Sequence, residues 1–324
     1  MTRARAFWLT GRGRGALKTE ILPDSGRAGW CVVRALFSAV SPGTERLVAG
    51  GKVPVALRQE MRCPYMGGRF PFPVKYGYSL VGEVIRGPAG LKGRRVQVLH
   101  PHQDFCVVRS EDVRLLPEGL PPTRATLTSN METAVTAIWD SGVVLGERVL
   151  VVGFGVIGSL IARILSLGPA VDLEVLETSP ERRRMAEAMG FRMSVPRPAG
   201  SVPYDVAFDA SGSASGLQAA IDAVGIEGRI VAVSWFGAEP ARLVLGGSFH
   251  SRRKRIFGSQ VSFIPGVVRP RWDVGRRTDL VFRLLGRPEF DPHVGPAVLF
   301  SDLPGAFKDL VRPSVEGLSP LIVY

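Results

Sequence analysis

The stretch from Val149 to Gly158, VLVVGFGVIG, constrains the fold of this chain more than any other part of it. Its four leading apolar residues predict a strand that is covered on both faces, as in a parallel sheet. Gly153 permits a tight turn, Gly155 lets a pyrophosphate approach the backbone, and Gly158 allows a helix to pack closely on the strand. The spacing therefore predicts a strand, a phosphate-binding turn and a helix over 159–167, in that order.

An acidic residue stands where such a unit needs one. The apolar run 171–176 leads to Glu177, nineteen residues beyond Gly158. A carboxylate there can bind the ribose hydroxyls of an adenine dinucleotide, and because it repels a 2′-phosphate it favours NAD(H) over NADP(H). Thr178, Ser179 and Arg182 would instead suit a phosphate if Glu177 turned away. The spacing predicts a cofactor site at Gly153, Gly155, Val156, Ile157, Gly158, Glu177, Thr178 and Arg182.

Length and composition indicate a globular protein of about two domains. The chain has 324 residues, of which 45% are hydrophobic and 22% charged. No apolar run approaches the ~18 residues of a membrane span, and the basic start has too short an apolar stretch for a signal peptide. We therefore expect a cytoplasmic protein without a membrane partner. Cys31, Cys63 and Cys106 are scattered, cannot form a four-cysteine zinc site and are expected to be reduced.

The chain carries 41 basic and 29 acidic residues, a net charge of +12. The basic residues are spread along the sequence, and no nucleic-acid motif accompanies the densest run, Arg252–Arg255. We interpret the surplus as solvated surface rather than as steering of an anionic ligand, and we do not expect a nucleic acid partner. The run that begins at His250 is likewise expected to be a solvated face rather than a contact to cofactor phosphate.

The texture of the sequence changes near residue 123. Residues 1–122 contain short β segments that Gly and Pro interrupt, including a predicted hairpin of 5–9 with 16–21. Strands then alternate with helices, which is typical of a doubly wound parallel sheet, and Ser179 with Pro180 predicts a helix start. We predict an α/β protein with a catalytic domain over 1–122 and 265–324 and a dinucleotide domain over 123–264.

This organisation resembles the medium-chain dehydrogenase/reductase superfamily over nearly the whole chain. The resemblance implies a β-rich GroES-like catalytic domain, a Rossmann domain, a cofactor in the cleft between them and a homodimer through the Rossmann domain. It adds Thr133 and Ser211 to the expected cofactor contacts. Within the superfamily the chain looks like the bacterial zinc-type alcohol dehydrogenase-like subgroup, and more distantly like bacteriochlorophyllide hydroxyethyl dehydrogenases. The matching motifs are residues 41–45, 77–84, 133–137, 146–153 and 209–212.

The resemblance also shows where this chain departs from zinc-dependent members. Their cysteine ligand aligns with Pro42, their histidine with Tyr78, and their third ligand with Ser129 if Thr133 is the family's threonine. A catalytic zinc needs about three nitrogen, sulfur or carboxylate ligands, and none of these positions qualifies. The cysteine cluster of the structural zinc lobe is absent as well. We therefore expect no metal in this protein.

Without a metal, proton transfer has to come from side chains. The resemblance places Thr44 at the family's relay hydroxyl, where it would bond substrate or nicotinamide ribose, or would merely close a turn. Tyr78 would donate a proton, or would fill the space that the metal leaves. Glu45 replaces the family's bracing aspartate and would hold Tyr78 or a basic residue, the latter being the more ordinary structural role.

Two histidines, His100 and His102, flank Pro101 and lie near no third metal ligand in the sequence. We expect a loop that lines the cleft, with His102 as an alternative proton donor. Together these features predict a zinc-independent oxidoreductase that transfers a hydride between NAD(P)(H) and a small carbonyl or alcohol, activated alkene or quinone. The alternative is a non-catalytic dinucleotide-binding module that serves as a sensor or a structural protein.

Overall fold

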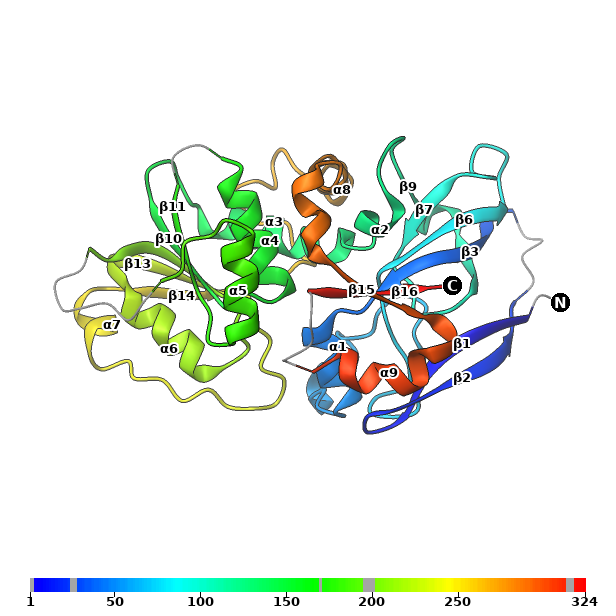
Figure 1. Cartoon of the computed structure of the whole chain (residues 1–324), viewed down its shortest axis with the longest axis horizontal. Coiled ribbons are helices and arrows are strands. Elements are labelled where there is room, and N and C mark those ends of the chain that lie inside the picture. Colours follow the sequence, from blue (N-terminus) through cyan, green and yellow to red (C-terminus); the bar gives the residue numbers. More distant parts are fainter. Residues whose placement is uncertain (1–2, 24–27, 169–170, 195–201, 313–317) are drawn as a thin grey trace. The chain divides into compact units, whose positions relative to one another are not determined.

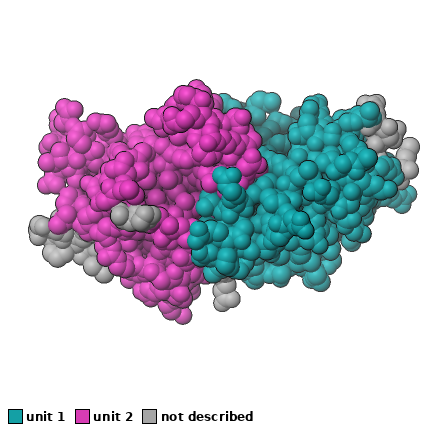
Figure 2. All heavy atoms as spheres, turned by 90° about the horizontal axis from the view of Figure 1, so that it is seen from above, with its two compact units in different colours: residues 1–129, 282–324 teal, residues 130–281 magenta. Residues whose placement is uncertain are grey.

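A computed structural model gives the arrangement of residues 3–23, 28–168, 171–194, 202–312 and 318–324. The chain forms two compact units, residues 1–129 with 282–324 and residues 130–281 (Figure 2). The unit boundaries fall inside the helices α3 (Thr128–Ser141) and α8 (Val274–Leu285). They differ by seven and seventeen residues from the boundaries predicted after 122 and 264.

Unit 1 is built on two sheets, and its hairpin is the one predicted. β1 (Arg3–Gly11) pairs antiparallel with β2 (Arg14–Ile21). The ring of Phe7 on β1 packs against the ring of Phe307 on the helix α9 (Leu303–Leu310), with centroids 4.8 Å apart. The four-stranded sheet has the order β2-β1-β5-β4, with β1 Arg3–Gly11, β2 Arg14–Ile21, β4 Gly67–Gly68 and β5 Val74–Lys75. The larger sheet has the order β15-β16-β3-β6-β7-β9, and β8 pairs with β3.

The larger sheet combines strands from both ends of the sequence, because β16 pairs antiparallel with β3. Its core is apolar and includes Cys31 and Cys106, which like Cys63 are free thiols, as predicted. The strands are β3 Trp30–Ala39, β6 Leu80–Arg86, β7 Arg95–Val98, β8 Phe105–Arg109, β9 Arg114–Leu115, β15 Val294–Leu299 and β16 Ser319–Val323. The helices of unit 1 are α1 Pro42–Ala49, α2 Pro122–Ala125 and α9 Leu303–Leu310, with 3₁₀ turns at 55–57, 110–112, 288–293 and 300–302.

Unit 2 contains a five-stranded sheet that is parallel throughout, in the order β11-β10-β12-β13-β14. Met193 forms an isolated parallel bridge to Val175 on β11 and stands where a further strand would continue this edge. The chain then crosses to the other side of β10, so the end of β10 is a switch point of the strand order. The strands are β10 Arg148–Val152, β11 Asp172–Leu176, β12 Tyr204–Asp209, β13 Val224–Ala232 and β14 Arg255–Gly258.

The helices of unit 2 connect these parallel strands, which confirms the predicted α/β class and the doubly wound sheet (Figure 1). Ser179 caps α5 through its side chain and Pro180 is the first helical residue, as the sequence indicates. Besides α3 and α8 the helices are α4 Val156–Ser166, α5 Pro180–Ala188, α6 Ala214–Ala223 and α7 Ser248–Ser251. In the described parts of the chain, no helix has the length and apolar character that crossing a membrane requires.

Candidate functional site

The glycine turn after β10 has the geometry that its sequence predicts. Gly153 has φ +94°, and a Cβ there would lie 2.8 Å from the backbone of Ala210. A Cβ on Gly158 would collide with the carbonyl oxygen of Gly153. A Cβ on Gly155 would instead meet nothing nearer than the Arg182 guanidinium, at 3.7 Å. Gly153 and Gly158 are therefore required by packing within the protein, whereas Gly155 leaves open space in front of the turn.

The helix that follows offers donors to that space. Gly155 is the N-cap of α4, and the first helical hydrogen bond runs from Ser159 N to Gly155 O at 2.9 Å. The N–H groups of Val156, Ile157 and Gly158 have no acceptor within the helix, as in every first helical turn. Free N–H groups and the positive end of the helix dipole together suit a phosphate. The residues present therefore fit a dinucleotide pyrophosphate.

Glu177 lies at the carboxyl end of β11 and is bound to the glycine turn. Its carboxylate accepts backbone N–H groups from Phe154 at 2.7 Å, Thr178 at 2.7 Å and Ser179 at 2.8 Å. Phe154 is itself fully buried and packs edge-on against Phe191. A carboxylate offers about four acceptor positions, so these three bonds leave one for a ligand hydroxyl.

Arg182 on α5 is the cation nearest to the open turn. Its Nε is buried and has no hydrogen-bond partner among the residues that the structure describes. Thr178, the neighbour of Glu177, is exposed. The structure thus brings Gly153, Gly155, Glu177 and Arg182 to one end of the parallel sheet.

The two contacts that the family resemblance added have different surroundings. Ser211 follows β12, and its hydroxyl donates to the buried carboxylate of Asp209 at 2.6 Å. Burial raises the pKa of Asp209, while hydrogen bonds from Ser211 and Ser234 lower it. Thr133 is half-buried on α3.

In unit 1, Tyr78 is the centre of a polar cluster. Its hydroxyl is hydrogen-bonded to the side chains of Ser41, the N-cap residue of α1, and Thr44, on the first turn of that helix. Burial and then the charge of Glu45 raise the pKa of Tyr78 to about 12, against the lowering effect of the two hydroxyls. Tyr78 and Thr44 are half-buried, so this part of the cluster reaches the surface of the chain.

Glu45 is buried and has partners that the sequence did not predict. One carboxylate oxygen accepts Ser41 N at 2.8 Å, which closes the start of α1 much as a capping box does, and the other lies 3.1 Å from Nε2 of His102. Nδ1 of His102 lies 2.8 Å from Ser38 Oγ, which is 2.9 Å from the hydroxyl of Tyr324.

This arrangement corrects the prediction that His102 lines a cleft. His102 is fully buried, and a Cβ on Gly77 would already press against its ring at 3.1 Å. With no exposed surface in this structure, it is joined to the cluster through Glu45. His100 is buried too, stacks on Tyr65 and has its pKa lowered to about 3, chiefly by burial.

The three positions that align with zinc ligands in the family lie together, because Ser129 Oγ donates to the carbonyl of Tyr78 at 3.0 Å and Pro42 stands next to Ser41. They offer a phenol, a neutral hydroxyl and a proline ring, which is not the ligand set that zinc takes. Within the described ranges, no three His, Cys, Asp or Glu side chains are grouped so that they could hold a metal.

The basic run at 252–255 has mixed surroundings. Arg253 and Arg255 are exposed and pair with Glu227, in line with a solvated face. The prediction is wrong for Lys254, which is buried and donates to the carbonyl of Ile221 at 2.6 Å. Lys254 closes the end of α6 because cations stabilise the terminal carbonyls of a helix.

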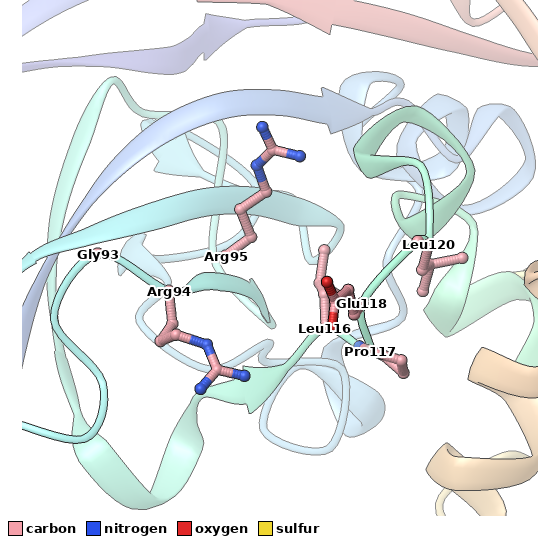
Figure 3. A pocket seen from close by; sticks show the side chains of 8 residues that line it. Gly93, Arg94, Arg95, Leu116, Pro117, Glu118 and Leu120 are labelled. Carbon is pink, nitrogen blue, oxygen red and sulfur yellow. The ribbon is translucent and has the colours of Figure 1, made fainter.

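A surface hollow of about 460 Å³ in unit 1 lies beside the ends of β7 and β9 (Figure 3). The side chains of Arg94 and Arg95 leave the chain in different directions there. None of its lining residues belongs to the Tyr78 cluster. The candidate site is therefore identified from its side chains, since this hollow lies elsewhere in unit 1.

No protein-family model matches the chain. It is 28% identical over 205 residues to the (R,R)-butanediol dehydrogenase of Bacillus subtilis, an alignment that covers 50% of this chain and 59% of that enzyme. The chain thus spans less than two thirds of this curated relative.

Solved structures match over a greater length. A putative zinc-binding dehydrogenase from Sinorhizobium meliloti bound to NADP superposes with a TM-score of 0.77, at 18% identity and 100% coverage of both chains. An Escherichia coli alcohol dehydrogenase complexed with NADH gives a TM-score of 0.78, at 15% identity and 100% coverage of both chains.

These structures share the fold of a GroES-like domain combined with a Rossmann domain. The chain therefore has the fold of these dehydrogenases, as its resemblance to the medium-chain dehydrogenase/reductase superfamily implies.

Proposed function

We propose that this protein is a zinc-independent oxidoreductase that transfers a hydride between NAD(H) and a small carbonyl or alcohol, activated alkene or quinone. The observation that carries the proposal is the hydroxyl of Tyr78. It is bound by Ser41 and Thr44, and the family resemblance places Tyr78 itself at the position of a zinc ligand. The relatives described above are named as dehydrogenases, which supports the reaction class.

The dinucleotide would be held by unit 2. The N–H groups of Val156 and Ile157 would bind its pyrophosphate, and Glu177 would bind its adenine ribose. A bound nicotinamide supplies or accepts the hydride. The fixed negative charge of Glu177 supports NAD(H) over NADP(H), because a 2′-phosphate would meet a carboxylate that three N–H groups hold in place.

Tyr78 would move the proton. In the reducing direction its phenol O–H gives the proton to the carbonyl or quinone oxygen of the substrate, or to the carbon of an activated alkene that does not receive the hydride. The hydroxyls of Ser41 and Thr44 then donate to the phenolate oxygen, while the charge of Glu45 favours its return to the neutral form. In the oxidising direction the same groups take the proton from the alcohol.

The reaction is tested with NADH and a panel of ketones, enones and quinones, followed by loss of absorbance at the nicotinamide band. Turnover of at least one class, lost in Tyr78→Phe, would support the proposal. Tight NADH binding without turnover of any member would identify a dinucleotide-binding module that has lost catalysis.

The absence of zinc has its own measurement. Elemental analysis of protein purified without added zinc should find well below one equivalent, and a chelator should leave its melting temperature and turnover unchanged. A stoichiometric zinc that a chelator removes together with activity would contradict the proposal.

We also propose a homodimer through unit 2. Among the described residues β14 pairs only with β13, so its outer edge has free backbone groups for a second copy. Light scattering on a size-exclusion column would show a mass of two chains, or would leave a monomer.

A further inference from the structure

Three buried side chains in unit 1 and the half-buried Tyr324 form a continuous series of hydrogen bonds. They are Tyr324, Ser38, His102 and Glu45, joined by contacts of 2.9, 2.8 and 3.1 Å. Ser38 and His102 have no exposed surface and Glu45 has 2%. Four different segments contribute to it, namely β3, the loop after β7, α1 and the residue after β16, and its first contact joins residues 286 positions apart in the sequence.

For a neutral imidazole, elementary bonding rules give this series of hydrogen bonds one direction. A carboxylate only accepts, so Nε2 of His102 must carry the hydrogen that faces Glu45. In the neutral imidazole Nδ1 is then an acceptor, and the hydroxyl of Ser38 donates to it. Ser38 has used its single hydrogen and accepts from Tyr324, whose oxygen in turn accepts the backbone N–H of Gln103.

The arrangement of Ser38, His102 and Glu45 has the residue types of a hydrolytic triad, but the geometry excludes that use. A nucleophilic serine has to reach a substrate, and Ser38 is completely enclosed. It is also bonded to the histidine on one side and to a tyrosine on the other. Its role is therefore directed inwards, to the histidine.

We propose that Ser38 and Tyr324 are positioning residues, which hold His102 as the neutral Nε2–H tautomer and thereby fix the Glu45 carboxylate beside Tyr78. The consequence for turnover rests on the proposed role of Tyr78, whereas the tautomer itself does not. With Nε2–H bonded to one oxygen and Ser41 N to the other, Glu45 cannot rotate away from the cluster. Loss of Ser38 leaves Nδ1 without a donor, so the ring is held only by its bond to Glu45 and can turn.

The tautomer is measured by long-range ¹H–¹⁵N correlation spectra of the full-length protein at pH 7.5. The chain has four histidines, so the ring of His102 is assigned by its disappearance in His102→Gln. We expect a protonated Nε2 and an unprotonated Nδ1 in the parent protein. A protonated Nδ1, in a neutral or a charged ring, would overturn the proposal.

Two variants test the positioning residues. Ser38→Ala should shift and broaden the Nδ1 resonance of His102, because the ring loses one of its two hydrogen bonds, and it should lower kcat about three- to tenfold, as expected for one lost hydrogen bond, at an unchanged KM for NADH. Tyr324→Phe removes only a hydroxyl and should shift the Nδ1 resonance and lower kcat less. It also serves if Ser38→Ala does not fold.

The matched control is Tyr65→Phe. It deletes a tyrosine hydroxyl that is bonded to Asp112 and takes no part in the hydrogen bonds that join Tyr324, Ser38, His102 and Glu45. Tyr65 stacks on His100, so this variant should change the resonances of His100 and leave those of His102 and kcat unaltered. Unchanged His102 resonances in both Ser38→Ala and Tyr324→Phe would contradict the proposal. If no substrate is turned over, the proposed function fails, and the spectra of His102 alone test whether Ser38 and Tyr324 position its ring.

Discussion

The backbone N–H of Phe154 donates to the carboxylate of Glu177 at 2.7 Å, so the acid that follows β11 is tied to the glycine turn that follows β10. Two neighbouring parallel strands thus end in a single hydrogen-bonded unit. The residue expected to select the cofactor also shapes the turn that receives its phosphates. Substitutions of Glu177 should therefore change both the stability of the fold and the preference for NADH over NADPH, and a suitable pair of variants can separate the two effects.

Glu177→Ala removes the acceptor of three N–H groups and should lower the free energy of unfolding by about 1–3 kcal/mol. It should also weaken NADH binding and raise the affinity for NADPH relative to NADH. Glu177→Gln is the matched control, since its amide oxygen still accepts while the charge is gone. It should shift the cofactor ratio with a smaller loss of stability, measured by urea unfolding and fluorescence titration. A parent protein that binds NADPH tenfold tighter than NADH would refute this role of Glu177.

Gly155 and Gly158 should respond differently to an added side chain. Gly155→Val enters open space, so the protein should fold with a near-parent melting temperature and yet fail to bind NADH, because the branch takes the place of the pyrophosphate. Gly158→Ala collides with the carbonyl of Gly153 and should lower the melting temperature by several degrees. Calorimetry and NADH titration of both variants test this, and equal destabilisation by the two would contradict it.

Tyr78→Phe keeps the ring and deletes the hydroxyl, so kcat should fall by about 10²–10⁴-fold while the Kd of NADH stays constant. Thr44→Val should act in the same direction but more weakly. Tyr76→Phe is the control, because its hydroxyl bonds the carbonyl of Met61 outside the cluster. With a pKa of about 12, Tyr78 should remain protonated through pH 10, so its contribution to the reduction rate should be lost only above that pH. Near-parent turnover in Tyr78→Phe would show that Tyr78 only lines the site and does not transfer the proton.

His100 should make the fold sensitive to acid. Burial lowers its pKa from 6.5 to about 3, so its stabilising contribution is complete above pH 6.5 and is lost as the pH falls towards 3. As the pH falls from 6.5 towards 3, the cost of keeping His100 neutral in the folded protein should reduce the free energy of unfolding by up to about 1.4 kcal/mol per pH unit. Urea unfolding from pH 7 to pH 4.5 should show a flatter decline for His100→Gln, whereas the exposed His250→Gln should parallel the parent.

Most of the sheet of unit 2 was predictable, because the runs of β10 and β11 lead to Gly153 and Glu177 and β12 ends in Asp209, whereas β14 was not predicted. The edge position of Met193 was not, since a single bridge leaves no hydrophobic pattern. The helix α1 was also missed. Pro42 and Gly43 resemble a turn, and only the return of the Glu45 carboxylate to Ser41 N completes the first helical turn.

The candidate site was predictable where its residues are close in sequence, as at 153–158 and 177–182. Tyr78, Thr44 and Glu45 were found through family resemblance, which also offered Tyr78 or a basic residue as the partner of Glu45; the contact of the Tyr78 hydroxyl with Ser41 and Thr44 was not predicted. Ser38 and Tyr324 gave no signal, because one is a serine within a strand and the other follows the last strand. Only the antiparallel register of β3 and β16 brings them together.

That pairing also has a consequence for how the chain folds as it is synthesised. Unit 2 is one uninterrupted segment, so all of its strands are available once residue 281 has been made. Unit 1 has to wait for 282–324, and until then β3 presents an unpaired edge where β16 will bind. Such an edge is open to wrong partners. We therefore expect the half of the protein that carries Tyr78 to mature last and to depend most on dilution or chaperones.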